Sequence, residues 1–137
     1  MQTIKQIHVS YQQAQALIDK TFLEAEKENL AVAACVVDAN GRIKAKMVMD
    51  GTSLIADELV EKKAKTALLG LSSEDFGNII HDQTIVRDSM LQLDGLTLMG
   101  GGLPLMQEGQ IIGAFAVGGA LVDQDIALAK AVLTSFA

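Results

Sequence analysis

Histidine, cysteine and paired carboxylates are the side chains that could give this sequence catalytic or metal-binding chemistry. The chain contains two histidines and one cysteine. Neither His8 nor His81 has a second histidine or a cysteine at the spacing of a metal-binding motif, so we expect no closed zinc site. Cys35 stands inside the apolar run 31–37, where burial raises a thiol pKa. We therefore expect Cys35 to pack in the core, and a reactive thiol is the less favoured alternative.

Glu58 and Glu61 are the carboxylate pair that comes closest to a cation site. In an expected helix the two share one face and could approach a hard cation. Lys62 and Lys65 lie within helical pairing distance of them, however, which favours a solvated, salt-bridged face. No Gly-x-Ser-x-Gly motif is present for a nucleophilic serine. We therefore name no catalytic residue, and any metal ligand stays unknown.

The last third of the chain is rich in glycine where strongly apolar segments end. Gly100, Gly101 and Gly102 form one run, and Gly118 and Gly119 follow an apolar stretch. Because glycine lets the backbone face a ligand, these turns are candidates for a binding site. The triple glycine lacks the Lys-Ser/Thr of a phosphate-binding loop, which disfavours nucleotide binding. A plain bend between strands explains it equally well.

Methionine sulfur is the remaining candidate ligand. Met47, Met49, Met99 and Met106 could each offer a soft sulfur atom to a metal. Alternation inside strands is the ordinary pattern of core filling, so we favour a packing role for these side chains.

Length and charge limit the class of protein. The 137 residues fit a single domain over 1–137. The formal net charge of -6 opposes binding to phosphate backbones, so nucleic acid is not an expected partner. The sequence has neither the long apolar run of a membrane span nor the apolar core of a signal peptide. We therefore expect no membrane partner and a cytoplasmic location.

Hydrophobic periodicity predicts helices at both ends of the chain and hairpins between them. Ser10 followed by Gln13 predicts a capped helix start, and Asn40-Gly41 predicts a tight hairpin turn. The predicted elements are a helix after Ser10, strands at 31–37 and 43–49, a helix over 54–70 with Leu54 and Ile55 turned inward, a short helix after Ser72, strands at 103–106 and 111–117, and a closing helix from about Asp123. Residues 77–94 show no clear periodicity. The pattern predicts an α+β fold with helices on both faces of an antiparallel sheet and 111–117 at its centre.

Several short motifs, in this order, resemble one known family. They are Val36-Val37-Asp38-Ala39-Asn40-Gly41, Asp50-Gly51, Lys63-Ala64-Lys65-Thr66-Ala67, Gly100-Gly101-Gly102-Leu103-Pro104-Leu105, Gly109, Ile112-Gly113-Ala114, Val117-Gly118-Gly119 and Gln124-Asp125. Each motif alone is weak, but their order and spacing are similar to the GlcG/HbpS family, also called the haem-degrading domain family. The same domain occurs at the C-terminus of PduO-type cobalamin adenosyltransferases. The resemblance covers nearly the whole chain.

The resemblance implies a fold and a way of assembling. It implies a profilin-like, three-layer α/β/α arrangement with a five-stranded antiparallel sheet, and self-association into dimers or larger rings. Some family members bind haem or related tetrapyrroles, one group acts as an extracellular haem sensor, and many have no assigned activity. The family usually has an arginine two residues before the Asp-Gly pair, where this chain has Val48. A site that used that guanidinium for a propionate would lose its bidentate partner.

The resulting hypothesis is a small ligand-binding protein, with haem or a related tetrapyrrole as the expected cofactor and a homo-oligomer as the expected state. The expected ligand-binding residues are Asp50, Gly51, Lys63, Thr66, Gly100, Gly101, Gly102, Gly118 and Gly119. Two alternatives stay open. One is an enzyme that acts on a small metabolite at a subunit interface. The other is an accessory protein whose apolar surfaces chiefly build an oligomer.

Overall fold

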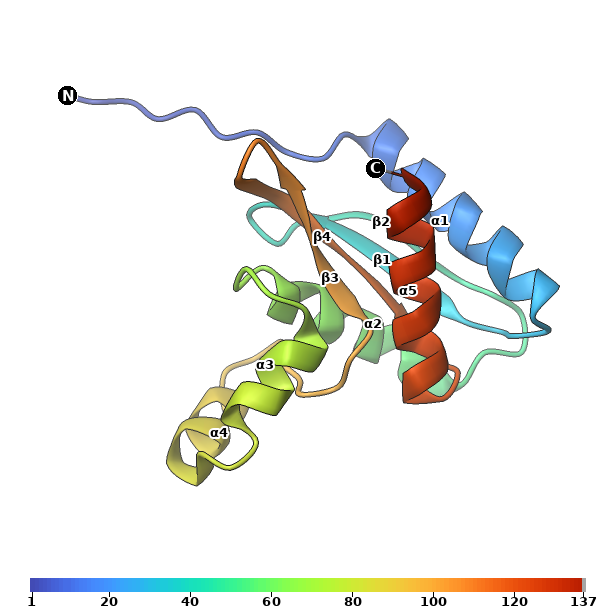
Figure 1. Cartoon of the computed structure of the whole chain (residues 1–137). Coiled ribbons are helices and arrows are strands. Elements are labelled where there is room, and N and C mark those ends of the chain that lie inside the picture. Colours follow the sequence, from blue (N-terminus) through green and yellow to red (C-terminus); the bar gives the residue numbers. More distant parts are fainter. Residues whose placement is uncertain (137) are drawn as a thin grey trace.

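A four-stranded antiparallel sheet with helices on both faces forms the body of the protein (Figure 1). The computed structural model describes residues 1–136. Its elements are α1 (Tyr11–Lys27), β1 (Ala33–Asp38), β2 (Ile43–Val48), α2 (Leu54–Ala67), α3 (Ser73–Ile80), α4 (Thr84–Leu91), β3 (Gly102–Gln107), β4 (Gln110–Gly118) and α5 (Val122–Phe136). The strand order is β2-β1-β4-β3. The inner strands are therefore β1 and β4, as the apolar pattern predicts.

The sheet has four strands among the described residues. The family resemblance implies five, so the expectation of a fifth strand is wrong. The segment between α2 and β3 forms two short helices instead. The Ser72 side chain accepts a hydrogen bond from the backbone N–H of Asp75 and so starts α3, and acidic Glu74 and Asp75 favour its first turn. Residues 92–101 then form turns around glycines. All four strands predicted from periodicity are present.

Helices α1 and α5 cover one face of the sheet. Ser10 and Gln13 form the predicted capping box at the start of α1. The buried face of α1 and its neighbours forms a core of branched aliphatic residues around Phe115, with Ile18, Val36, Val117 and Leu128 among them. Burial of this apolar surface holds the two helices on the sheet.

Helix α2 covers the opposite face through small side chains. Ala33 and Cys35 of β1 pack with Ala56, Val60 and Ala64 of α2. Small residues let the helix lie close to the strands, so backbone atoms of both elements come near each other.

The prediction that Leu54 and Ile55 turn inward is wrong. Leu54 is 91% exposed, and Ile55 is also exposed. The buried stripe of α2 follows Ala56, Val60 and Ala67, and helical periodicity turns Leu54 to the opposite side of that stripe.

The predicted tight turn at Asn40-Gly41 is present, and a second tight turn joins β3 and β4. The Asp38 carboxylate accepts hydrogen bonds from the backbone N–H groups of Asn40 and Arg42, and Gly41 has φ +86. In the turn between β3 and β4, Glu108 and Gly109 both have positive φ, as a two-residue hairpin requires. These turns fix the register of the neighbouring strands.

Helices α3 and α4 form an arm that extends away from the sheet (Figure 1). Two of the α3 residues, Phe76 and Ile80, bury apolar side chains at its base, but α4 has no buried residue. Residues 1–7 extend away from the body and are exposed, whereas Val9, just before α1, is buried against β4 (Figure 1).

Candidate functional site

Three of the predicted site residues come together around a fourth, the buried Lys63. The Lys63 side chain is 0% exposed, and its Nζ donates hydrogen bonds to the carbonyl oxygen of Val117 and to Oδ2 of Asp125, each at 3.0 Å. Gly101, Gly102 and Gly118 all approach Lys63 closely. The glycine motifs, which are far apart in the sequence, therefore meet over the lysine of α2.

Asp125 completes this cluster from the first turn of α5. Its second oxygen, Oδ1, accepts a hydrogen bond from the backbone N–H of Ala120 at 3.0 Å. The side chains of Lys63 and Asp125 are almost fully buried, so each charge depends on the other for compensation. The ion pair ties α2, the end of β4 and the start of α5 to one another.

The glycines at this cluster are closely packed. A Cβ at Gly102 would collide with the carbonyl oxygen of Lys63, and a Cβ at Gly101 would lie 2.5 Å from the carbonyl oxygen of Val117. At Gly118 a Cβ would press on Val60 Cγ1, and at Gly100 on Ile126. Protein atoms therefore occupy the space next to these glycines in the isolated chain. Their role toward a ligand stays a prediction.

Thr66 is buried one turn along α2 from this cluster and has two protein partners. Its Oγ1 donates a hydrogen bond to the carbonyl oxygen of Lys62 at 2.8 Å and accepts one from the backbone N–H of Thr97 at 2.9 Å. The second contact fastens the loop before the triple glycine to α2. This hydroxyl positions the loop in the isolated chain.

Asp50, Gly51 and Gly119 lie toward the surface. Gly119 packs against Thr52, in the same loop as Asp50 and Gly51. Asp50 borders a hollow of about 390 Å³ at the end of β2, which we call the β2-end hollow. Its other lining residues are Phe22, Glu26, Met47, Val48 and Met49. The predicted residues thus form a buried cluster around Lys63 and an exposed loop at Asp50.

The structure also contains an apolar groove that the sequence analysis missed. We call it the β3 groove; its volume is about 340 Å³. Its lining residues come from the segment before α1, α1, β3, β4 and the end of α5, and are Val9, Gln13, Leu17, Pro104, Leu105, Met106, Ile112, Leu133 and Phe136. None of these residues is charged. This lining suits an apolar ligand, since most ligand pockets are lined by apolar side chains with few polar groups.

Met106 gives the β3 groove its one soft donor atom. This side chain is 51% exposed at the edge strand β3, so its thioether is available rather than packed in the core. The prediction that the methionines fill the core is therefore wrong for Met47, Met99 and Met106, which are 51%, 40% and 51% exposed, because Met47 and Met106 lie on the outer strands β2 and β3 and Met99 lies in a loop. Pro104 on this strand is a sequence signal for the groove, since proline inside a sheet is confined mostly to edges.

The carboxylate pair Glu58 and Glu61, which the sequence suggested for a cation, forms salt bridges with lysines instead. Glu61 pairs with Lys46 at 3.2 Å and Glu58 with Lys62 at 3.6 Å, which confirms the salt-bridged face. The pKa of Lys46 is raised, mainly by its hydrogen bond to Asp57. No group of three or more potential His, Cys, Asp or Glu metal ligands occurs within residues 1–136.

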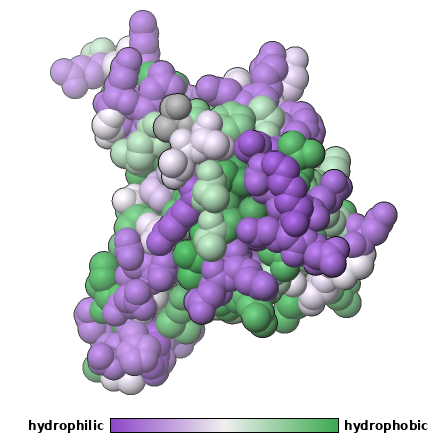
Figure 2. Space-filling model, turned by 45° about the vertical axis from the view of Figure 1, so that its right-hand side comes forward, coloured by the Kyte–Doolittle hydropathy of each residue, from purple (hydrophilic) through white to green (hydrophobic). Residues whose placement is uncertain are grey.

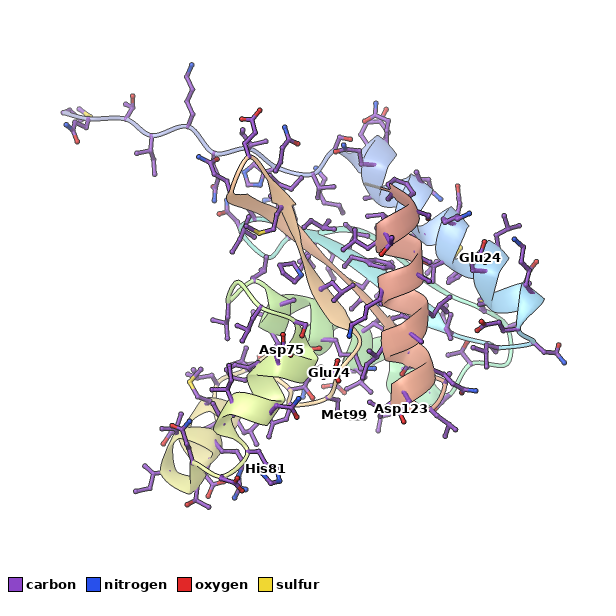
Figure 3. All side chains as sticks on the ribbon, viewed as in Figure 1. Glu24, Glu74, Asp75, His81, Met99 and Asp123 are labelled. Carbon is purple, nitrogen blue, oxygen red and sulfur yellow. The ribbon has the colours of Figure 1, made fainter. Side chains whose placement is uncertain are left out.

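His81 and Cys35 are two further side chains that could be reactive. His81 lies on the arm at the end of α3, where its side chain is 73% exposed and pairs with Asp82 (Figure 3). Cys35 is fully buried, as predicted, and burial raises the pKa of its thiol to about 12. Along the described part of the chain, no helix is long and apolar enough to cross a membrane.

Comparisons with known proteins agree with this architecture. The family model described as "Haem degrading protein HbpS-like" matches residues 9–134. The protein GlcG of Escherichia coli strain K12 is 34% identical over 110 residues, which are 80% of each chain. The crystal structure of Klebsiella pneumoniae protein ORFY superposes with a TM-score of 0.90 at 27% identity, covering 99% of this chain and 96% of that one.

A haem complex is also among the similar structures. The crystal structure of a PduOC:Heme complex has a TM-score of 0.86 at 24% identity, over 94% of this chain and 95% of that one. At this identity the likeness concerns the fold. From the match of the family model over residues 9–134 and the identity to GlcG, the chain belongs to the GlcG/HbpS-like family.

Proposed function

We propose that this protein is a homo-oligomeric, cytoplasmic binding protein for haem or a related tetrapyrrole, held in the β3 groove. The observation that carries the proposal is an uncharged groove of about 340 Å³ with an exposed thioether in its wall. Membership of a family described by haem degradation and the haem complex of PduOC support the ligand class.

The lining of the groove fits the apolar part of such a ligand. Leu105, Ile112 and Leu133 offer an aliphatic surface, and Phe136 adds an aromatic ring. The Met106 thioether is of the type that serves as an axial ligand to haem iron in cytochromes. When bound, haem supplies an iron centre that binds ligands and exchanges electrons. The volume of the β3 groove, about 340 Å³, is near the lower end of the range for ligand pockets. Part of the macrocycle would therefore stay outside the groove.

The lack of charged side chains in the groove lining determines which edge of the ligand can enter it. No lysine or arginine lines the β3 groove, so carboxylate side groups of a tetrapyrrole remain in water. The family's usual arginine before the Asp-Gly pair is Val48 here, which removes one alternative partner for a propionate. The ligand therefore enters with its apolar edge first.

The predicted loop at Asp50 supports a second, different candidate. Asp50 and Glu26 place two carboxylates at the β2-end hollow. This arrangement favours a cationic metabolite and disfavours haem propionates. An enzyme or accessory role toward a small metabolite would use this hollow, and the other predicted residues around Lys63 would hold its loop in place.

Titration of haem into the purified protein tests the proposal. We expect a shifted and sharpened Soret band at micromolar protein. Met106→Leu keeps the volume and removes the sulfur atom, so its complex should show a different ligand-field spectrum and at least about tenfold weaker affinity. Met99→Leu is the matched control, since Met99 is also exposed and does not line the groove.

Two outcomes would contradict the proposal. The first is a spectrum identical to that of free haem in the presence of the wild-type protein. The second is a Met106→Leu complex that matches the wild type in both spectrum and affinity, which would place haem elsewhere.

A further inference from the structure

Helix α4 has apolar side chains that its own chain leaves exposed, although Leu91 borders Ile55 and Leu59 of α2. None of its eight residues is buried, and Ile85 is 83% exposed. Val86, Leu91 and the following Leu93 are exposed as well, and Figure 2 shows apolar side chains on the outside of the projecting arm. A helix this short is not stable in water by itself, and contiguous exposed apolar side chains mark an interaction site. Another surface must therefore cover α4.

The arm is also strongly acidic. Residues 72–95 contain five acidic residues and one arginine. Arg87 is engaged with its neighbour Asp88, and Glu74 with Lys130 at the base of the arm. Asp75, at the start of α3, and Asp94, at the end of the segment, are exposed. The surface that covers the arm should therefore be apolar and basic.

The edge strand β2 has that composition. Residues 39–49 contain Arg42, Lys44 and Lys46 and no acidic residue, in a chain whose net charge is -6. Lys46 already pairs with Asp57 and Glu61 of α2, so Arg42 and Lys44 are the basic side chains that a partner could meet. Ile43, Met47 and Val48 of the same strand are exposed. Strand β2 is the outer strand of the sheet, and lysines on an edge strand oppose pairing with a second edge strand. A helix from another molecule can cover such an edge.

We propose that the arm of one copy packs on the β2 edge of the next copy. Ile85 and Val86 would then lie against Ile43 and its exposed neighbours, and the acidic side chains of the arm would face Arg42 and Lys44. This inference rests on the self-association proposed above and is independent of haem.

The contact is between two different surfaces of the chain. An arm-to-arm contact would instead bring together two segments of the same charge sign, since each arm has five acidic residues and one arginine and only Glu74 and Asp88 pair with a lysine or an arginine of their own chain among the described residues. Because the arm and the β2 edge lie on separate parts of the molecule (Figure 1), repeated contacts build a ring when the rotation between copies closes.

Paired variants test this geometry by analytical ultracentrifugation. Ile85→Glu places a charge in the apolar surface of the arm and leaves the β2 edge unchanged. Ile43→Glu places a charge in the β2 edge and leaves the arm unchanged. We expect the wild type to be larger than a dimer and each variant alone to be monomeric. A mixture of the two variants retains one functional contact, so it should form a heterodimer of twice the chain mass.

The controls separate this contact from other causes of dissociation. Leu121→Glu adds the same charge at an exposed leucine outside both surfaces and should leave the assembly unchanged. Far-UV circular dichroism checks that each variant is folded. Ile85→Ser and Ile43→Ser form a second pair of variants, which removes the apolar side chain without adding a charge. A monomeric wild type would overturn the self-association itself. An oligomer that survives both glutamate variants, or a mixture that stays monomeric, would overturn only the arm-to-β2 contact, and haem titration reads out the groove separately.

Discussion

At the scale of single residues, the buried ion pair between Lys63 and Asp125 is the most consequential polar contact. It joins three elements at a point where the glycine motifs of the family meet. Burial of both charges makes the pair costly to form and more costly to break on one side only. Its fully buried position makes Lys63 part of the framework in the isolated chain, although its sequence position alone suggested a ligand contact.

Removing one partner of this pair should destabilise the protein strongly. Lys63→Met leaves the Asp125 carboxylate buried without a cation, and we expect a loss of about 3–5 kcal/mol in the free energy of unfolding. Adding Asp125→Asn removes the uncompensated charge and keeps an oxygen that can accept from Ala120, so the double variant should recover part of that loss. Urea denaturation measures both. A double variant that is less stable than Lys63→Met would contradict this account.

The buried thiol of Cys35 predicts a loss of stability at alkaline pH. Burial raises its pKa from 9.0 to about 12, so the folded state favours the protonated thiol. This contribution is complete below pH 9 and is lost as the pH rises from 9 toward 12, by at most about 1.4 kcal/mol per pH unit. Cys35→Ala should show a smaller decrease than the wild type over this range in urea denaturation. Equal slopes for the two proteins would refute the assignment.

At the scale of elements, close approach between β3 and α2 explains why the chain has glycine at position 102. A Cβ there would collide with the Lys63 carbonyl oxygen, and the backbone N–H of Gly102 donates to Ser73 Oγ at 2.9 Å. The strand therefore lies against α2 and α3 at once. The triple glycine acts in the isolated chain as a site of helix-on-strand packing.

Substitution of Gly102 by alanine should consequently separate these elements. We expect Gly102→Ala to destabilise the fold by about 1–3 kcal/mol, since backbone must move to accept the methyl group. Gly109→Ala is an informative comparison, because no atom lies within 4 Å of its added Cβ and only the positive φ opposes the change. Thermal unfolding of both variants measures the difference. A Gly102→Ala protein as stable as the wild type would show that β3 does not depend on this contact.

At the scale of the whole molecule, the isolated chain leaves several apolar surfaces open. The β3 groove is lined by elements distant in sequence, whereas the arm and the β2 edge are each formed by one continuous segment of the chain. Exposed apolar surfaces of this kind are where interaction sites are found, and the proposed assembly and the proposed ligand binding both start from them. Family membership supports the proposed ligand class. The β3 groove, the arm and the β2 edge are the surfaces at which substitutions can test the proposed binding and assembly.

The sequence by itself determined the elements of the fold. Periodicity, the Ser10 and Ser72 caps and the Asn40-Gly41 turn are local signals, and the elements they predict are present because the stabilising contacts span only a few residues. The family was also readable from the order of short motifs. Residues 77–94 gave no clear pattern because α4 buries nothing in its own chain, so no apolar stripe faces a core.

Only the tertiary structure decided which polar and apolar side chains meet. The partner of Lys63 is 62 residues away in the sequence, and the β3 groove draws its lining from four elements and the segment before α1. Long-range contacts of this kind depend on how helices settle on the sheet, which local patterns do not encode. The same packing placed atoms against the glycines and left Met106 open at an edge, and this is the physical reason why the groove proposed for the ligand does not include the glycine turns named from the sequence.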